Sequence, residues 1–200
     1  MTLQSSLSPS FGLTSLIANL LQPVDQTSSL GSLIAPLQTS VPYDMLLSGT
    51  TTGAMKTGTP VPTEYIPFIK EASQTYGVPP ERIAAMIMAE SSFRPNLRGS
   101  SGEYGLTQMM PTTMPEVGLA LQNAFDPRSN IMAGTQYLRR KYDEFKNWDL
   151  AHAAYNAGSG GVRRAGLRIP QNKYTPTYIR NINAYVPWYK QWMQDNGWYD

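Results

Sequence analysis

The sequence has 200 residues, enough for one ordinary domain and an additional segment, and its 16 Lys and Arg against 14 Asp and Glu give a formal net charge of +2. This near-balance argues against a dedicated nucleic-acid binder, which carries a strong basic excess. The absence of cysteine excludes a disulfide scaffold and a thiol nucleophile, and a single histidine excludes a multi-histidine metal site. No apolar run reaches the roughly 18 residues of a membrane-spanning helix, so we expect no transmembrane segment. We also expect no metal and no cofactor.

The composition changes near residue 56. Residues 1–55 contain no Lys or Arg, two acidic residues and 17 Ser or Thr, whereas 19 of the 21 aromatic residues follow them. Short leucine-rich patches in this part cannot build a core of their own. We therefore predict an extended Ser/Thr-rich N-terminal arm over residues 1–60 that anchors the protein to an assembly partner, and a catalytic domain over residues 61–200. The first residues lack the positive charge of a secretory signal, so we expect another route to any extracytoplasmic site.

The pattern after residue 60 is helical. Helices are expected from Thr63 to Gly77, from Pro79-Pro80 to about Glu90, from Asp126-Pro127 to about Phe145, from Leu150 to Ala157, and from Pro176 to Asp195. A short hairpin is possible between Ser100 and Gln108, and no other segment alternates like a strand. The expected fold class is all-α, with at most a small hairpin.

Glu90 is the first candidate for catalysis. It falls on the apolar stripe formed by Ile83, Met86 and Ile87, near the end of its helix. A carboxyl group against apolar surface loses hydration of its charged form, so its pKa should rise. A general acid needs this property to hold a proton near neutral pH.

Three ordered motifs connect Glu90 to a known family. Glu90-Ser91 is followed by Gly105-Leu106-Thr107-Gln108 and then by Ala154-Tyr155-Asn156-Ala157-Gly158. The set resembles the soluble lytic transglycosylases, with their Glu-Ser, Gly-Leu-Met-Gln and Ala-Tyr-Asn-Ala-Gly motifs, over about residues 62–192. The resemblance implies a lysozyme-like helical domain that binds peptidoglycan glycan strands and cleaves the β-1,4 bond between N-acetylmuramic acid and N-acetylglucosamine.

The resemblance also implies the roles of single residues. Glu90 would be the only catalytic acid and base, protonating the leaving oxygen and then accepting the proton of the muramoyl C6 hydroxyl as a 1,6-anhydro ring closes. The substrate's N-acetyl carbonyl would stabilise the cationic centre, so no carboxylate nucleophile is required. Ser91, Gly105, Gln108, Tyr155 and Asn156 would contact or position the sugar, although Ser91 could equally be a capping residue and Gln108 could bind only backbone. Tyr185, in a Tyr-Val pair, would orient Glu90 through its hydroxyl.

Four further positions need a separate interpretation, because they depart from the family pattern or offer an alternative catalytic group. Thr107 stands where Met is usual, and we expect altered packing behind the active site. Gly99 stands where the family commonly has Ser. Glu103 is a possible second carboxylate for a lysozyme-type hydrolase, but we expect it to be a solvated loop residue. His152 is expected to be a structural, hydrogen-bonded imidazole.

The leading prediction is therefore a peptidoglycan lytic transglycosylase. The alternatives are a lysozyme-type muramidase and, from another class, a structural protein that binds glycan without cutting it. The arm favours a bacteriophage virion component that opens the host cell wall for genome delivery, acting in the host periplasm. A cell-wall-opening enzyme of a bacterial secretion apparatus is the second setting.

Overall fold

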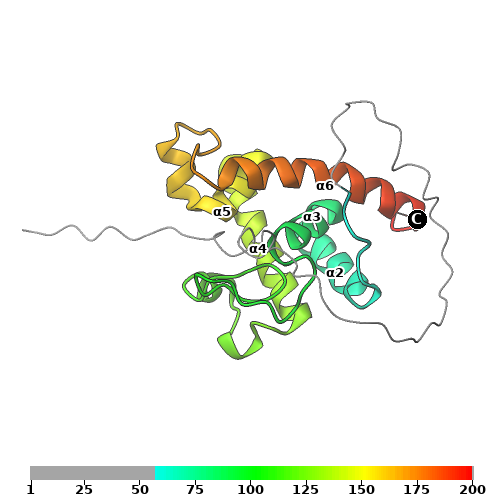
Figure 1. The fold of residues 1–200 in the computed structure, drawn as a ribbon. Helices are drawn as coiled ribbons and strands as arrows, with labels where there is room; N and C mark the ends of the chain where they lie inside the picture. The colour runs from blue at the N-terminus through cyan, green and yellow to red at the C-terminus, as the bar shows by residue number, and fades with distance from the viewer. Residues whose placement is uncertain (1–56, 200) are drawn as a thin grey trace, which may run out of the picture.

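The computed structural model describes residues 57–199, so the predicted arm lies outside it except for its last residues. Five α-helices make up most of this part (Figure 1): α2 Ile66–Tyr76, α3 Pro80–Ser91, α4 Pro127–Phe145, α5 Trp148–Arg164 and α6 Thr175–Asp195. Short 3₁₀ turns cover Thr63–Tyr65, Met114–Val117 and Leu121–Asn123. All five predicted helices are present, and no strand occurs within residues 57–199.

The helix boundaries follow local sequence signals. The Asp126 side chain accepts a hydrogen bond of 2.8 Å from the Ser129 backbone N–H, and Pro127 opens α4 without losing a backbone donor. α5 continues beyond its predicted end at Ala157, but Gly158 breaks the helical geometry with φ 75° and ψ 150°. The predicted stop at Gly158 is therefore a kink, after which the chain makes one more short helical stretch.

Helix α3 is the central element of the core. Its residues from Ile83 to Ile87 are completely buried, and the helix packs against α6 and α2. α4 packs against α2 and α5, and α6 lies across the top of the molecule in Figure 1 over α3 and α5. Burying a large aliphatic side chain contributes roughly 1.5–3 kcal/mol, so α3 is held rigidly by its own apolar residues. A side chain near the end of α3 is therefore also held in a fixed position.

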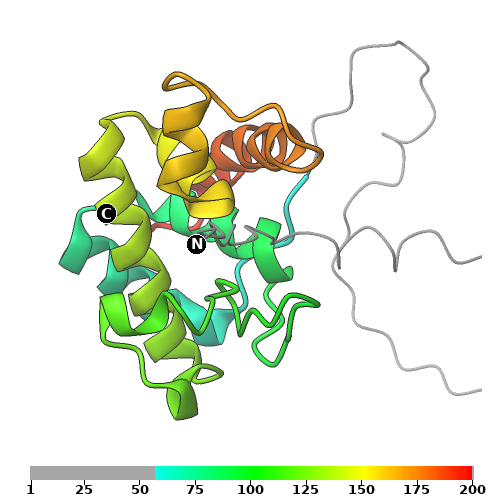
Figure 2. The ribbon, with the colours of Figure 1, turned by 90° about the vertical axis from the view of Figure 1, so that its left-hand side faces the viewer.

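The connection between α3 and α4 forms the lower end of the molecule in Figures 1 and 2. The hairpin expected there is reduced to two isolated bridges, Arg98 with Tyr104 and Tyr104 with Met109. A second, smaller apolar cluster supports this connection, formed by Met109, Met114, Leu119, Ala124 and Ala133. The connection between α3 and α4 therefore packs as a compact loop region against α4.

The packed domain begins before residue 61. Thr59 accepts, through its carbonyl oxygen, a 2.9 Å hydrogen bond from the Tyr189 hydroxyl, and Val61 is buried in the core. Gly58 lies against Trp188, so closely that a Cβ atom there would stand 2.8 Å from the indole ring. Gly58 and Thr59, which fall within the predicted arm, thus pack against α6.

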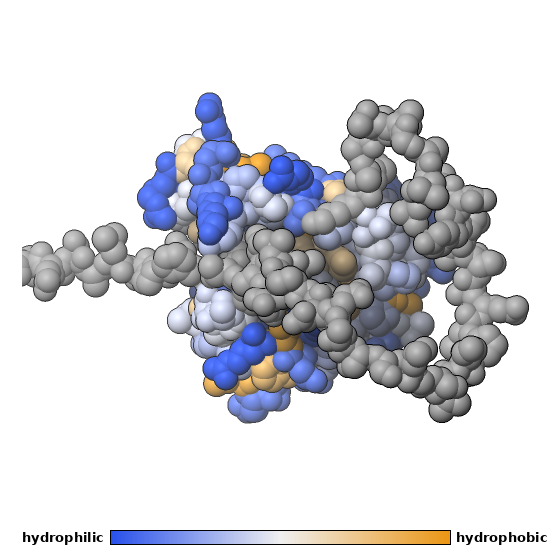
Figure 3. Space-filling model, viewed as in Figure 1, coloured by the Kyte–Doolittle hydropathy of each residue, from blue (hydrophilic) through white to orange (hydrophobic). Residues whose placement is uncertain are grey.

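The surface is mostly hydrophilic in the view of Figure 3. Exposed arginines gather over the end of α5 and the loop to α6, namely Arg163, Arg164 and Arg168. Within residues 57–199, no helix is both long and apolar enough to cross a membrane, and no group of three or more potential metal-ligating side chains is found.

Candidate active site

Glu90 is the penultimate residue of α3 and is only 8% exposed. Burial, with a smaller contribution from the negative charge of Glu103, raises the pKa of its carboxyl group from 4.5 to about 8. The apolar stripe of α3 therefore produces the effect predicted from the sequence. At neutral pH the carboxyl group is mainly protonated, which is the state of a general acid.

Tyr178 on α6 is the partner of Glu90 that sequence reasoning missed. Its buried hydroxyl interacts with the Glu90 carboxyl and partly offsets the rise in the Glu90 pKa. This hydroxyl forms no hydrogen bond of normal distance and angle within residues 57–199. The sequence signal was weak, because Tyr178 is one of 12 tyrosines and belongs to none of the three motifs.

Tyr155 on α5 lies between Glu90 and the Gly-Leu-Thr-Gln segment. Its hydroxyl donates a 2.7 Å hydrogen bond to the Thr107 carbonyl oxygen and lies 3.3 Å from the Met109 sulfur. Burial, followed by the charge of Glu90, raises the Tyr155 pKa well above its usual value. The first and third motifs therefore meet around Glu90, and Tyr155 connects them to the second.

Asn130, one turn into α4, anchors the second motif. Its side-chain oxygen accepts hydrogen bonds of 2.8 Å from the backbone N–H and the hydroxyl of Thr107. Its amide nitrogen donates to the carbonyl oxygens of Tyr104 and Ala124, at 3.0 and 2.8 Å. A buried Asn satisfied on both sides holds the loop in one place. The signal for it was a polar residue among the buried, mostly apolar residues of α4.

Gly105 has a packing role at this anchor. Its φ is +76°, and a Cβ atom would stand 2.5 Å from the Asn130 amide nitrogen and 2.6 Å from the Ala124 carbonyl oxygen. Any other residue would be strained and would displace the anchor. The close approach that requires a glycine here is to Asn130.

The Gln108 amide group is held by its own loop. Its nitrogen donates to the carbonyl oxygens of Leu97 and Gly105, at 3.1 and 2.7 Å. Because both amide hydrogens are used, the side-chain oxygen is the atom left for a ligand. Ser91 is fully buried, and its hydroxyl donates to the Ile87 carbonyl oxygen one turn earlier at 3.2 Å. The contacts of Ser91 are thus those of a helix-end residue.

Asn156 is oriented from the start of α6. Its side-chain oxygen accepts a 2.8 Å hydrogen bond from the Thr175 hydroxyl. The Asn172 amide nitrogen in turn donates to the Thr175 oxygen at 2.8 Å. This chain of hydrogen bonds directs the oxygen of Asn156 toward Thr175 and leaves its amide nitrogen as the donor for a ligand.

Residues 67–176 match the family described as the transglycosylase SLT domain. The chain belongs to this family. It is 33% identical over 115 residues to the transglycosylase of Enterobacteria phage PRD1, covering 58% of this chain and 42% of that protein. It is 30% identical over 156 residues to the soluble lytic murein transglycosylase of Escherichia coli K12, covering 67% and 24%.

Solved structures give the same result for the fold. The soluble lytic transglycosylase SLT70 of E. coli matches with a TM-score of 0.61 and 29% identity, over 66% of this chain and 25% of that one. An inactive Glu-to-Gln mutant of the lytic transglycosylase Slt of Pseudomonas aeruginosa matches with a TM-score of 0.60 and 29% identity, over 66% and 25%. The lysozyme-like helical fold is therefore confirmed. The chain spans less than half the length of these relatives.

Two departures from the SLT pattern have a structural explanation. Thr107 is completely buried and faces α4, where a Cβ atom on Gly134 would stand 2.4 Å from its hydroxyl oxygen. Its polar contacts with Asn130 replace apolar packing at this position. Gly99 lies against the side chain of Glu103, and a Cβ atom there would stand 2.1 Å from Glu103 Oε2.

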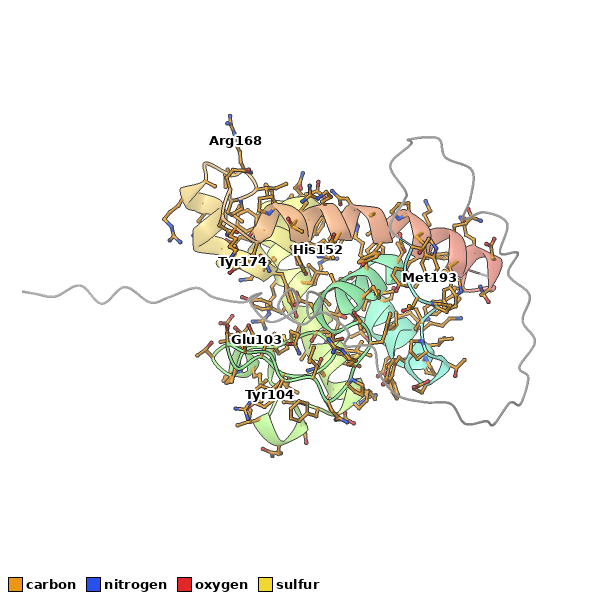
Figure 4. All side chains as sticks on the ribbon, in the orientation of Figure 1. Glu103, Tyr104, His152, Arg168, Tyr174 and Met193 are labelled. Atoms are coloured by element: carbon orange, nitrogen blue, oxygen red, sulfur yellow. The ribbon has the colours of Figure 1, made fainter. Side chains whose placement is uncertain are left out.

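Glu103 is not the solvated loop residue that we expected. It is 7% exposed, and Oε2 accepts a 3.1 Å hydrogen bond from the Ser101 backbone N–H. Figure 4 shows it in the loop region between α3 and α4. The absence of a side chain at Gly99 gives its carboxylate room to lie within the loop, close enough to Glu90 for its charge to act there.

Tyr185 and His152 complete the sequence-predicted set. Tyr185 is buried on α6, two turns beyond Tyr178, and its expected contact with Glu90 stays a prediction. His152 is completely buried, but the expected hydrogen bond is absent, because neither ring nitrogen has a partner within residues 57–199. Burial and the charge of Arg82 lower its pKa to about 3, so it is neutral.

Proposed function

We propose that this SLT domain is a peptidoglycan lytic transglycosylase that cleaves the β-1,4 bond between N-acetylmuramic acid and N-acetylglucosamine. The observation that carries the proposal is Glu90, a buried carboxyl group with a pKa of about 8 at the meeting point of the motif residues. The relatives named above as lytic murein transglycosylases support the choice of substrate.

The reaction needs one group that gives and then recovers a proton. Protonated Glu90 donates its proton to the glycosidic oxygen as the C1–O bond breaks. The substrate's N-acetyl carbonyl stabilises the positive charge at C1. The muramoyl C6 hydroxyl then attacks C1 and returns its proton to Glu90, which leaves a 1,6-anhydro ring and consumes no water. This is a variant of the substrate-assisted exceptions to two-carboxylate glycosidases.

The surrounding residues prepare Glu90 and the sugar for these steps. The Tyr178 hydroxyl stabilises the carboxylate form that exists between the two proton transfers. The Asn156 amide nitrogen is a donor to a sugar hydroxyl or N-acetyl carbonyl, and Gln108 Oε1 is an acceptor. Tyr155, Gly105 and Ser91 hold the backbone around them, and Tyr185 belongs to the same buried face of α6 as Tyr178.

The first test is Glu90→Gln, which keeps the shape of the side chain but cannot exchange a proton. We expect the initial rate on purified sacculi to fall by about 10² or more. Comparable turbidity loss with the variant would contradict the assignment. Tight binding to sacculi by a wild-type protein that never cuts them would instead establish the glycan-binding structural role.

A lysozyme-type muramidase is the second candidate, because Glu103 is buried near Glu90. A second carboxylate can activate water or act as a nucleophile, and hydrolysis would then leave reducing ends. Mass spectrometry of the released muropeptides separates the two reactions. We expect 1,6-anhydromuramic ends, and reducing muramic ends as the main product would establish the muramidase.

The proposed setting is a bacteriophage virion component that opens the host cell wall locally, acting in the periplasm. The PRD1 relative supports a phage origin, and the Lys/Arg-free composition of residues 1–55 supports an anchoring arm that docks on an assembly partner. A bacterial secretion apparatus is the alternative setting. Immunodetection of the protein in purified phage particles, or its copurification with secretion-apparatus subunits, decides between them.

A further inference from the structure

A second carboxylate, that of Glu103, lies buried in the loop near the proposed catalytic acid Glu90. Glu103 is 7% exposed although it lies in a glycine-rich loop, where a charged side chain can reach water freely. Burying a charge costs free energy unless specific contacts compensate. Its Oε2 has one such contact, the Ser101 backbone N–H at 3.1 Å. The burial of Glu103 therefore needs a reason beyond the stability of the loop.

The absence of a side chain at Gly99 leaves the space that this carboxylate occupies. A Cβ atom at Gly99 would stand 2.1 Å from Glu103 Oε2 and 2.8 Å from Gln108 Oε1. Any side chain at position 99 would push the carboxylate out of its place. The position that commonly holds Ser in the resembling family is thus empty here, and the Glu103 carboxylate lies against it.

The same contacts place two acceptor oxygens side by side. The amide hydrogens of Gln108 are both bonded to backbone carbonyl oxygens, and its Oε1 borders the same space beside Gly99 as the Glu103 carboxylate. Two acceptors with only one backbone donor between them favour a positive or hydrogen-donating group from outside. The guanidinium of Arg98 does not supply it, because it stacks on the Tyr104 ring at 4.8 Å from the centroid.

We propose that Glu103 is a further catalytic residue, whose carboxylate faces the reacting sugar and stabilises the positive charge that develops at C1. The proposal rests on the proposed function, in which Glu90 cleaves a glycosidic bond. As the Glu90 proton moves to the leaving oxygen and the C1–O bond breaks, positive charge spreads over C1 and the ring oxygen. Glu103 stabilises this charge together with the N-acetyl carbonyl and gains or loses no proton itself.

The charge of Glu103 has a second effect, on Glu90. The groups that act on Glu90 are Tyr178 from α6, Tyr155 from α5 and Glu103 from the loop. Of these, Glu103 carries negative charge, which disfavours a second negative charge on Glu90. Neutralising Glu103 therefore removes a contribution that keeps Glu90 protonated.

The test is Glu103→Gln in the full-length protein, assayed on purified sacculi between pH 5 and 9. We expect the initial rate at pH 6 to fall about tenfold or more, because an oriented charge at the reacting centre is lost. The alkaline limb of the pH–rate profile should also move to lower pH, because the pKa of Glu90 falls. Glu116→Gln is the matched control: it removes an exposed carboxylate from the same loop region and should change neither quantity.

Gly99→Ala provides a second, independent variant. The added methyl group should displace the Glu103 carboxylate and reproduce both effects. In the double variant Gly99→Ala and Glu103→Ala, any loss beyond that of Glu103→Ala alone measures the effect of the added methyl group on Gln108 Oε1, which it would approach to 2.8 Å. Melting temperatures check folding, and the double variant should be at least as stable as Gly99→Ala.

The outcomes separate this proposal from the proposed function. A Glu103→Gln variant with the wild-type rate, or with a lower rate but an unmoved alkaline limb, would overturn the catalytic role of Glu103. Wild-type activity of Gly99→Ala would overturn it as well. A fully active Glu90→Gln variant would instead overturn the proposed function itself.

Discussion

At the scale of single residues, the protonation of Glu90 results from opposing neighbours. Burial and the charge of Glu103 raise its pKa, whereas the hydroxyl of Tyr178 lowers it. A group with a pKa of about 8 is protonated before the reaction and can still lose its proton during it. Position 90 on the apolar face of α3 therefore determines the main property of the acid, and residues from α6 and the loop adjust it.

Tyr178→Phe tests the contribution from α6. Loss of the hydroxyl removes a group that stabilises the Glu90 carboxylate, so the pKa of Glu90 should rise and the alkaline limb of the pH–rate profile should move to higher pH. This direction is opposite to that expected for Glu103→Gln. We also expect a lower maximal rate on sacculi, because the carboxylate intermediate is less stable.

Tyr76→Phe is the control for this experiment, because Tyr76 lies at the end of α2 and is not among the groups that shift the pKa of Glu90. An alkaline limb that stays in place in Tyr178→Phe would show that Tyr178 does not act on Glu90.

At the scale of elements, α4 holds the loop that carries the second motif. The four hydrogen bonds of Asn130 to Thr107, Tyr104 and Ala124 replace the strand pairing that the loop lacks. Glycines at positions 105 and 134 leave room for these contacts. The loop region is therefore positioned mainly by one polar side chain, Asn130, on the buried side of α4.

Asn130→Ala should release this loop. We expect a loss of about 2–4 kcal/mol in the free energy of unfolding, because several buried donors and acceptors lose their partner. Activity should fall further than stability alone explains, since Gln108 and Glu103 lie on the released segment. Chemical denaturation and initial rates on sacculi measure the two effects. Arg140→Ala, an exposed change on the same helix, should leave both unchanged, and a fully active Asn130→Ala variant would contradict the anchoring role.

At the scale of the whole molecule, two buried groups give the folding stability an unusual dependence on pH. The folded-state pKa of Glu90 is raised from 4.5 to about 8, so its contribution is fully present below pH 4.5 and is lost as the pH rises to about 8. The folded-state pKa of His152 is lowered from 6.5 to about 3, so its contribution is fully present above pH 6.5 and is lost as the pH falls to about 3. The two slopes oppose each other between pH 4.5 and 6.5.

We therefore expect the melting temperature to be highest between about pH 4.5 and 6.5 and to decline on both sides. Glu90→Gln should flatten the decline on the alkaline side, because a neutral amide has no proton to lose. His152→Phe should flatten the decline on the acid side. Thermal unfolding monitored by circular dichroism from pH 3 to 9 checks all three proteins. An unchanged alkaline slope in Glu90→Gln would show that Glu90 is not the group responsible.

The extent of the domain can be tested by truncation. A chain that begins at Thr57 keeps the contacts of Gly58, Thr59 and Val61 with α6 and the core, so it should fold and cleave sacculi at nearly the full rate. A chain that begins at Pro62 loses them and should melt at a lower temperature.

The same truncation tests the role proposed for the arm. The chain that begins at Thr57 should fail to enter the particle or secretion apparatus, which a pull-down from assembled particles measures. Normal assembly of this shortened protein would contradict an anchoring role for residues 1–56.

The helices, the motifs and the choice of Glu90 as the proposed acid follow from local sequence signals. Capping residues, prolines and glycines define helix boundaries by backbone chemistry alone, and the apolar stripe of α3 was enough to predict a raised pKa for Glu90. The fold class followed because helical periodicity is a short-range property.

Apart from Tyr155, which belongs to the third motif, the residues that act on Glu90 or hold the loop were decided only by tertiary structure. Tyr178, Asn130 and Glu103 come from α6, α4 and a loop, and no spacing in the sequence relates them to Glu90. Glu103 was expected in solvent because a glycine-rich loop usually exposes its charges. It is buried because Gly99, four residues earlier, leaves its carboxylate a place that becomes visible only when the loop is folded. Side-chain burial and charge–charge contacts depend on which elements meet in space, and the order of residues along the chain does not contain that information by itself.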